Sequence, residues 1–365
     1  MAKKMEKMRV DLEVITDQHK KFKLMADTNA NELKVVDIRE TSSMMEAQII
    51  IGRTGEREKL LASLSESVTG GMTILPIYGI GGLGKTTLAK MVYNSNQFKD
   101  YSQVWVYVPQ IFDLKKIGNS VISQLSEKES RYTGVQMIQS SLSKLLADKK
   151  IFIVLDDLWE DMESHLDSLK AMLRVGKGSK VVVIVTTRDE GIAKKMSTIE
   201  PHKLAPLTGD MCWSIIEQKC DFESRLDKEE LEQIGMEITM KYKGVALAAQ
   251  SLGHMLHSVT FGEWESVRNS HIWDVSTAEE APSTHVLASL RLSYSVMPPY
   301  LKLCFAYCAT FPKGCKIVKD DLIHQWVSLG FVEPPDVFSS WQLGEREILG
   351  SFWGCPSFKI QSRHR

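Results

Sequence analysis

The sequence predicts an α/β domain with a parallel sheet, followed by an all-α extension. From Ile49 to about Pro206, short apolar segments rich in β-branched residues alternate with segments that have helical spacing. Apolar strands connected by helices are typical of a parallel sheet that helices cover on both faces. Beyond Leu207 the strand pattern nearly vanishes and helical spacing continues. We therefore expect a sheet flanked by helices and then a helical bundle.

Each element is expected from its own periodicity, with short apolar runs indicating buried strands and three-to-four-residue spacing indicating helices. The predicted strands are 72–78, 103–108, 150–155 and 180–186, and the predicted helices of the sheet domain are 87–93, 113–125, 136–148 and 163–173. The predicted helices of the extension are 209–220, 228–242, 245–257, 261–270, 284–295, 299–309 and 318–329.

The first strand leads into a glycine-rich loop with the pattern G-x-x-x-x-G-K-[ST], and a helical segment follows. This strand–loop–helix order is the context in which backbone N–H groups cradle nucleotide phosphates, as in P-loop NTPases. We expect Lys85 to reach the β- and γ-phosphates and the Thr86 hydroxyl to bind Mg²⁺. The predicted nucleotide-binding residues of the loop are Gly79, Ile80, Gly81, Gly82, Leu83, Gly84, Lys85, Thr86 and Thr87.

A second pattern overlaps this loop, because Gly79, Gly81 and Gly84 also satisfy G-x-G-x-x-G. That pattern is typical of dinucleotide-binding folds, in which an acidic residue at the end of the next strand holds the ribose. Here the next predicted strand is followed by Pro109 and no acid. The Lys-Thr pair of the loop and the missing acid favour a P-loop over a dinucleotide site.

The third predicted strand ends in two carboxylates, Asp156 and Asp157. Because the carboxyl ends of parallel strands border the ligand crevice, we expect both side chains to face the phosphates. We predict that Asp156 anchors Mg²⁺ through water and that Asp157 orients or deprotonates the attacking water. The alternative is that the pair caps the next helix.

The fourth predicted strand is followed by Arg188, which places a guanidinium at the same edge of the sheet. We expect Arg188 to sense a γ-phosphate, since a guanidinium binds phosphate oxygens through paired hydrogen bonds. The alternative is an exposed arginine that begins a helix together with Asp189 and Glu190.

The overall composition is ordinary for a protein with hydrophobic cores, with 43% hydrophobic residues and a net charge of −1 over 365 residues. The balanced charge gives no field that attracts nucleic acid, and no apolar run approaches the ~18 residues of a membrane span. The charged start of the chain leads into no secretory core, and six scattered cysteines do not indicate a disulfide framework. We therefore expect no nucleic-acid partner, no transmembrane segment and a cytoplasmic location.

Cys304, Cys308 and Cys315, with His324 further along, raise the question of a metal site. Zinc sites usually have tighter paired spacings, and free cysteine is among the most buried residue types. We expect these cysteines to belong to the core. In the polar N-terminal region, the spacing of apolar residues predicts a short amphipathic helix over 5–22, which would need a partner surface either on this chain or in a coiled coil with another chain.

Several segments also match a known family in order along the chain. They are 50–56 (IIGRTGE), the P-loop, the 98–112 stretch, 155–159 (LDDLW), 185–188 (VTTR), 204–207 (LAPL) with Cys212-Trp213, and 304–313 (CFAYCATFPK). Over about residues 49–345 the chain resembles the NB-ARC domain of plant coiled-coil NBS-LRR disease-resistance proteins, a STAND-class P-loop NTPase.

The resemblance implies that the chain binds ADP or ATP with Mg²⁺. It also implies that Arg53 belongs to a segment beside the adenine, and that Ala246 stands where the family's nucleotide-contacting proline would lie. Because proline fixes φ, we expect the alanine to loosen the adenine pocket.

The same resemblance, with the shifts in pattern, divides the chain into four parts. They are a partial N-terminal coiled-coil helix and linker (1–47), a P-loop nucleotide-binding domain (48–206), a helical ARC domain (207–298) and a partial winged-helix domain with an atypical end (299–365). Relative to the family, we expect a chain truncated at both ends.

The resemblance implies an ADP/ATP-binding molecular switch of plant innate immunity, reset by slow ATP hydrolysis, with protein partners at the N-terminal helix or oligomerisation when ATP is bound. The alternative is a truncated paralogue that binds ADP or ATP without regulated signalling. A turnover ATPase is disfavoured because the sequence shows no substrate-gripping insertion. A DNA-binding winged helix is disfavoured because the candidate reading helix at 319–326 carries two acids.

Overall fold

The computed structural model describes most of the chain between residues 43 and 332. The described residues are 43–44, 50–66, 71–109, 111–174, 178–242, 244–257, 259–270, 291, 294, 299–311, 317–332 and 360–361. The amphipathic helix predicted at 5–22 lies outside these residues, as does most of the helix predicted at 284–295.

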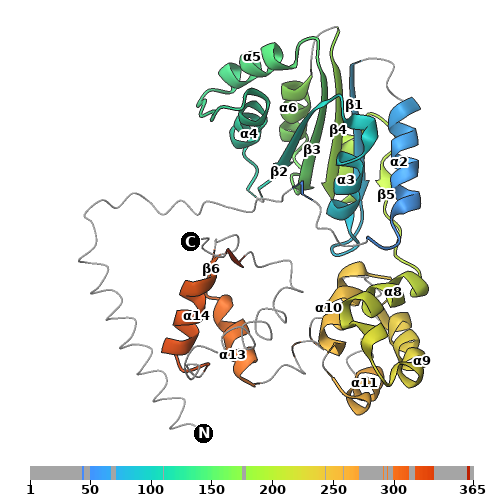
Figure 1. The fold of residues 1–365 in the computed structure, drawn as a ribbon. Helices are drawn as coiled ribbons and strands as arrows, with labels where there is room; N and C mark the ends of the chain where they lie inside the picture. Colours follow the sequence, from blue (N-terminus) through green and yellow to red (C-terminus); the bar gives the residue numbers. More distant parts are fainter. Residues whose placement is uncertain are drawn as a thin grey trace. The chain divides into compact units, whose positions relative to one another are not determined.

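Five parallel strands form one sheet in the order β2-β3-β4-β1-β5 (Figure 1). The strands are β1 (Gly71–Tyr78), β2 (Ser102–Tyr107), β3 (Lys150–Leu158), β4 (Lys180–Thr187) and β5 (His202–Lys203). The four longer strands lie where the periodicity predicts them, so the predicted parallel α/β sheet is confirmed. The fifth strand is an addition, since two residues show no periodicity; its His202 pairs with Ile77 of β1.

Helices cover both faces of this sheet, as the continuous apolar strands predict. Neighbouring residues of a strand point to opposite faces, so β1 sends Leu75 and Ile77 into one core and Ile74 into the other. The first core is completed by α2 (Thr54–Glu66) and α3 (Lys85–Tyr93). The second core is completed by α4 (Leu114–Ser126), α5 (Val135–Leu146), α6 (Glu163–Leu173) and α7 (Glu190–Met196).

Helices follow the sheet along the chain, in agreement with the predicted all-α extension. They are α8 (Gly209–Cys220), α9 (Lys228–Thr239), α10 (Ala246–Leu256) and α11 (Phe261–Arg268). The Thr208 hydroxyl caps the start of α8, and Thr260 and Glu263 form a capping box at the start of α11. Helix α9 packs so closely on Trp213 that a Cβ at Gly235 would lie 1.9 Å from the ring. Only glycine fits at that crossing.

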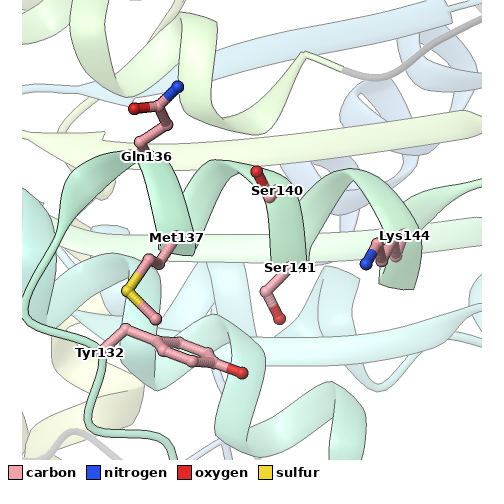
Figure 2. Close-up of a pocket in the computed structure, with 6 residues that line it drawn as sticks. All are labelled: Tyr132, Gln136, Met137, Ser140, Ser141 and Lys144. Carbon is pink, nitrogen blue, oxygen red and sulfur yellow. The ribbon is translucent and has the colours of Figure 1, made fainter.

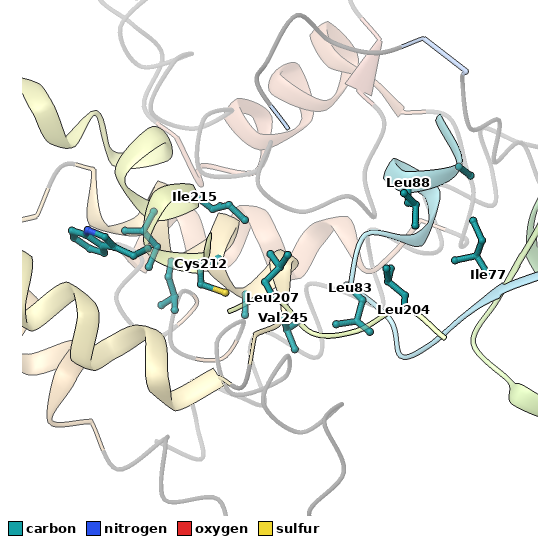
Figure 3. Close-up of a cluster of buried hydrophobic side chains, with 14 of the residues drawn as sticks. Ile77, Leu83, Leu88, Leu204, Leu207, Cys212, Ile215 and Val245 are labelled. Carbon is teal, nitrogen blue, oxygen red and sulfur yellow. The ribbon is translucent and has the colours of Figure 1, made fainter. Parts of the chain in front are cut away.

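The core on the α2–α3 face of the sheet continues into these helices (Figure 3). Leu83, in the loop after β1, and Leu204, in the segment after β5, belong to this cluster. Leu207 and Val245 extend it to Cys212 of α8, and all five side chains are buried. One apolar cluster therefore joins the sheet to the helices that follow it.

Two later helices, α13 (Pro299–Cys308) and α14 (Lys319–Ser328), share a smaller core of their own. Its buried members are Leu301, Cys304, Cys308, Leu322 and Trp326. Burial raises the pKa of the Cys304 and Cys308 thiols to about 11, so both stay protonated at neutral pH. Within the described ranges no cluster of His, Cys, Asp and Glu suits a metal ion. The two cysteines are core residues, as predicted; Cys315 lies outside the described residues.

The remaining described elements are short. They are the 3₁₀ turns Asn96–Phe98, Phe222–Ser224 and Met240–Tyr242, and the strands β6 (Ile317–Val318) and β7 (Ile360–Gln361), which pair in parallel. In the part of the chain that the structure describes, no helix combines the length and the apolar character needed to cross a bilayer.

Candidate nucleotide-binding site

The loop between β1 and α3 has the backbone of a phosphate cradle. Gly82 (φ +80°) and Gly84 (φ +99°) both have left-handed φ angles, which glycine adopts without steric cost. Gly84 is the N-cap residue and α3 begins at Lys85, so the unpaired N–H groups of the first helical turn lie at the loop. Backbone donors and the helix dipole at one place favour an anion such as phosphate. The loop therefore fits the nucleotide predicted from the sequence.

Lys85 is folded inward over this loop and is only 7% exposed. Its Nζ donates to the carbonyl oxygens of Gly79 (2.7 Å) and Ile80 (2.9 Å). Burial lowers the pKa of Lys85 to about 8; the nearby Arg188 adds to the effect, and the carboxylates of Asp157 and Asp156 oppose it. The loop thus holds a cation whose charge is sensitive to pH just above neutrality.

Asp156, at the end of β3, is fully buried and joins two threonine hydroxyls. Its Oδ1 accepts from Thr86 Oγ1 (2.9 Å) and from Thr186 Oγ1 (2.6 Å). The structure therefore brings together Thr86 and Asp156, the two residues predicted to serve Mg²⁺. Hydroxyl and carboxylate oxygens suit this ion, which typically takes few protein ligands beside phosphate oxygens and water. The residues present fit the implied metal.

Asp157 has a strained backbone, with a φ of +65°. The pairing of β3 with β4 shifts register between Leu155 and Leu158, and such an irregularity re-aims side chains at a sheet edge. The Asp157 N–H donates to Thr186 Oγ1 (2.8 Å), which holds the distorted turn in place. The alternative that the aspartate pair caps the next helix does not hold, because the N-cap of α6 is Met162.

Arg188 follows β4 and reaches back to the P-loop. Its Nε lies 3.8 Å from Asp157 Oδ1, and a Cβ at Gly81 would lie 3.1 Å from its Nη1. The next residue, Asp189, caps α7 by accepting from the Ile192 N–H (2.9 Å). A helix therefore begins here, as the alternative expects, and the guanidinium nevertheless lies beside the loop.

Arg53 lies at the P-loop but is bonded to backbone carbonyls. It is 3% exposed, and it donates from Nη2 to Leu83 O (2.7 Å) and from Nη1 to Ala205 O (2.9 Å). Burial lowers the pKa of Arg53, and the nearby carboxylate of Glu56 opposes this shift. These bonds tie the loop to the segment that leads into α8. The sequence gives no signal for this clamp beyond the GRxxE pattern.

The first turn of α10 lies directly on the P-loop. The Leu247 N–H donates to Gly82 O (3.0 Å), and a Cβ at Gly82 would lie 2.8 Å from Leu247 Cβ. Ala246 is the first residue of α10 and follows Val245, the N-cap residue, whose backbone is extended. The structure therefore places Ala246 beside the loop, next to a contact that sequence reasoning did not predict.

A separate hollow of about 520 Å³ lies on the surface of α5 (Figure 2). It is lined by Tyr132, Gln136, Met137, Ser140, Ser141 and Lys144. None of the residues predicted to bind nucleotide lines this hollow. We place the candidate site at the P-loop, because the backbone donors, the buried lysine and the hydrogen-bonded aspartate converge there.

A parallel sheet with this loop at the end of β1 and these carboxylates at the end of β3 defines a P-loop nucleotide-binding protein. Residues 53–226 match the NB-ARC domain. The chain is 35% identical over 341 residues to the disease-resistance protein RGA2 of Solanum bulbocastanum, covering 91% of this chain and 34% of that protein. It is 33% identical over 304 residues to an RPP13-like disease-resistance protein of Arabidopsis thaliana, covering 80% of this chain and 28% of that one.

The chain belongs to the NB-ARC family of plant disease-resistance proteins, which confirms the predicted resemblance. It spans about a third of the length of the curated relatives it matches. Among solved structures, a STAND ATPase with a tetratricopeptide-repeat sensor from Pyrococcus horikoshii aligns with a TM-score of 0.49 and 16% identity, covering 87% of this chain and 40% of that one.

Proposed function

We propose that this chain is an ADP/ATP-binding molecular switch of plant innate immunity, in which slow ATP hydrolysis resets the switch. The observation that carries the proposal is the hydrogen bond from the Leu247 N–H to Gly82 O (3.0 Å). The loop suited to phosphate is the same loop that the helical segment binds. A ligand shifts a conformational equilibrium only through different contacts in the two states, and this loop is placed to provide them.

In this proposal the loop residues from Gly79 to Thr87 bind the phosphates, with Lys85 as the charged donor. Thr86 and Asp156 hold Mg²⁺, which supplies charge neutralisation to the phosphates when it is bound. Asp157 orients or deprotonates the attacking water, and Arg188 senses the γ-phosphate. The geometry supports these roles because hydroxyl, carboxylates and guanidinium lie at one edge of the sheet.

Arg53 and Ala246 take supporting positions beside the nucleotide in this proposal. Arg53 acts by holding the end of the P-loop through Leu83 O, since its guanidinium is already bonded within the protein. Ala246 borders the adenine side as the first residue of α10. The parts 1–47, 48–206, 207–298 and 299–365 remain our proposed domain division, together with a cytoplasmic location and with protein partners or oligomerisation in the ATP-bound state.

The proposal is tested by calorimetric titration of ADP with Mg²⁺ into the wild type and Lys85→Ala. One charged hydrogen bond contributes about 1.5–3 kcal/mol, so the variant should bind ADP about ten- to a hundredfold more weakly. Lys90→Ala is the matched control, because Lys90 lies on the same helix and its Nζ donates to Met44 O (3.3 Å), away from the loop. Equal affinity of the wild type and Lys85→Ala would remove the P-loop assignment.

A further inference from the structure

The Trp159 ring lies against the Arg188 guanidinium. The Cζ atom of Arg188 is 4.4 Å from the centre of the indole ring, within the range of a cation–π interaction. Trp159 directly follows β3, and Arg188 directly follows β4, so the contact joins the ends of two neighbouring strands. Trp159 as a whole is 36% exposed.

The guanidinium also borders the P-loop. A Cβ at Gly81 would lie 3.1 Å from Arg188 Nη1 and 3.4 Å from its Cζ, so the guanidinium covers this part of the loop. The guanidinium is therefore in contact with the indole ring and also adjacent to the loop at Gly81. If a nucleoside triphosphate is bound in the loop, its γ-phosphate would lie near a guanidinium held in this position.

Among the described residues, the other charged partner of Arg188 holds it only weakly. Its ion pair with Asp157 spans 3.8 Å, and the arginine side chain is 48% exposed, so solvent screens the pair. Arg188 also repels the buried ammonium of Lys85, and this repulsion helps to lower the pKa of that lysine. A long cationic side chain that is repelled by its neighbour needs a contact that restricts its rotamers, and the flat ring provides one.

We propose that Trp159 is a positioning residue that sets the preference of the site for nucleoside triphosphate over diphosphate, by holding the Arg188 guanidinium over the P-loop. This inference rests on the proposed nucleotide-binding function. Trp159 acts through Arg188 alone. It therefore affects the affinity for the triphosphate and leaves the affinity for the diphosphate unchanged.

The test measures the affinities for ADP and for the non-hydrolysable β,γ-imido analogue of ATP, both with Mg²⁺, by calorimetry. Trp159→Leu should weaken binding of the triphosphate analogue by about two- to fivefold, the effect of an exposed cation–π contact, and should leave ADP affinity unchanged. Trp159→Tyr keeps an aromatic face and should keep the wild-type preference. Met162→Ala is the control, because Met162 is an exposed apolar residue (54%) of the same segment.

A double-mutant cycle with Arg188→Ala shows whether the tryptophan acts through the arginine. In the Arg188→Ala background, Trp159→Leu should have no further effect on either ligand. The inference is overturned if Trp159→Leu leaves the triphosphate affinity unchanged, weakens both ligands equally, or has its full effect without Arg188. If the wild type binds neither ligand, the proposed function fails and the inference fails with it. If Lys85→Ala weakens ADP binding but Trp159→Leu changes nothing, only the inference fails.

Discussion

The two faces of the sheet carry different kinds of core. The core under α4 to α7 is composed of residues between Ile74 and Met196 and is confined to the sheet and its own helices. The core on the α2–α3 face continues through Leu83 and Val245 (Figure 3). It extends as far as Val267 in α11. The P-loop lies where the core on the α2–α3 face passes from the sheet to α8 and α10. One core therefore stabilises the sheet and its own helices, whereas the other also connects the phosphate-binding loop to the helical segment.

The largest effect is expected from Gly244→Ala, which should disrupt the packing that connects the P-loop to the helical segment. Gly244 has a φ of +76°, and a Cβ there would lie 2.2 Å from Leu207 O, a backbone atom that cannot move cheaply. The free energy of unfolding should fall by about 3 kcal/mol, from backbone strain and overpacking together. Urea denaturation measures the loss, and calorimetry should show weaker ADP binding.

The matched control is Gly118→Ala, which lies in α4 on the opposite face of the sheet, the face covered by α4 to α7. A Cβ at Gly118 would lie 2.4 Å from Ile138 Cγ2, the end of a side chain, so this variant should also lose stability. It should keep its ADP affinity at temperatures where it is folded, because this core does not reach the P-loop. If Gly118→Ala and Gly244→Ala weaken ADP binding equally, the two faces do not differ in the way we infer.

The next effect concerns nucleotide itself. ADP at a hundred times its dissociation constant should stabilise the chain by about 2.7 kcal/mol, and the sheet and the α8–α11 segment should gain that stability together. Limited proteolysis around Pro206–Asp210 should slow when ADP is added to the wild type. The protection should vanish in Lys85→Ala. If the rate of cleavage in the wild type is the same with and without ADP, nucleotide bound at the loop does not stabilise the helical segment.

A smaller effect should follow from pH, through Lys85. Its pKa of about 8 in the folded chain lies below the usual 10.5, so the ammonium that binds phosphate is lost as the pH rises through 8. ADP should bind about tenfold more weakly at pH 9 than at pH 7, while Lys85→Ala should lack this component. The sign for unliganded stability is opposite. Between pH 8 and 10.5 the unfolded chain binds more protons, so Lys85 makes the free energy of unfolding rise with pH.

The smallest effect is expected from Ala246→Pro, which should stabilise the start of α10 where it contacts the P-loop. Ala246 is the first residue of α10, a helix position that accepts proline well. Val245 before it has φ −85° and ψ 113°, the extended conformation that a residue preceding a proline favours. The variant should gain about 0.4–1 kcal/mol of stability and release ADP more slowly. The off-rate of a fluorescent ADP analogue measures this. If the wild type already holds ADP for hours through gel filtration, the alanine does not loosen the site.

Much of the fold and of the site could be predicted from the sequence, because the signals are local. The strands and the P-loop are visible in consecutive residues, where periodicity and a glycine pattern each correspond to one backbone geometry. The placement of Asp156, Asp157 and Arg188 at one edge also follows from the sequence. It requires only that each residue ends a parallel strand of a single sheet.

The tertiary structure alone decided which of these residues touch and which are already engaged. The bond from Leu247 to Gly82 joins residues far apart in sequence, and no local pattern encodes it. The same holds for the carbonyls that engage Arg53 and for the Trp159 ring against Arg188. The reason is physical: local propensity depends on neighbours along the chain, whereas these contacts depend on how whole elements pack, with distance tolerances of a few tenths of an ångström.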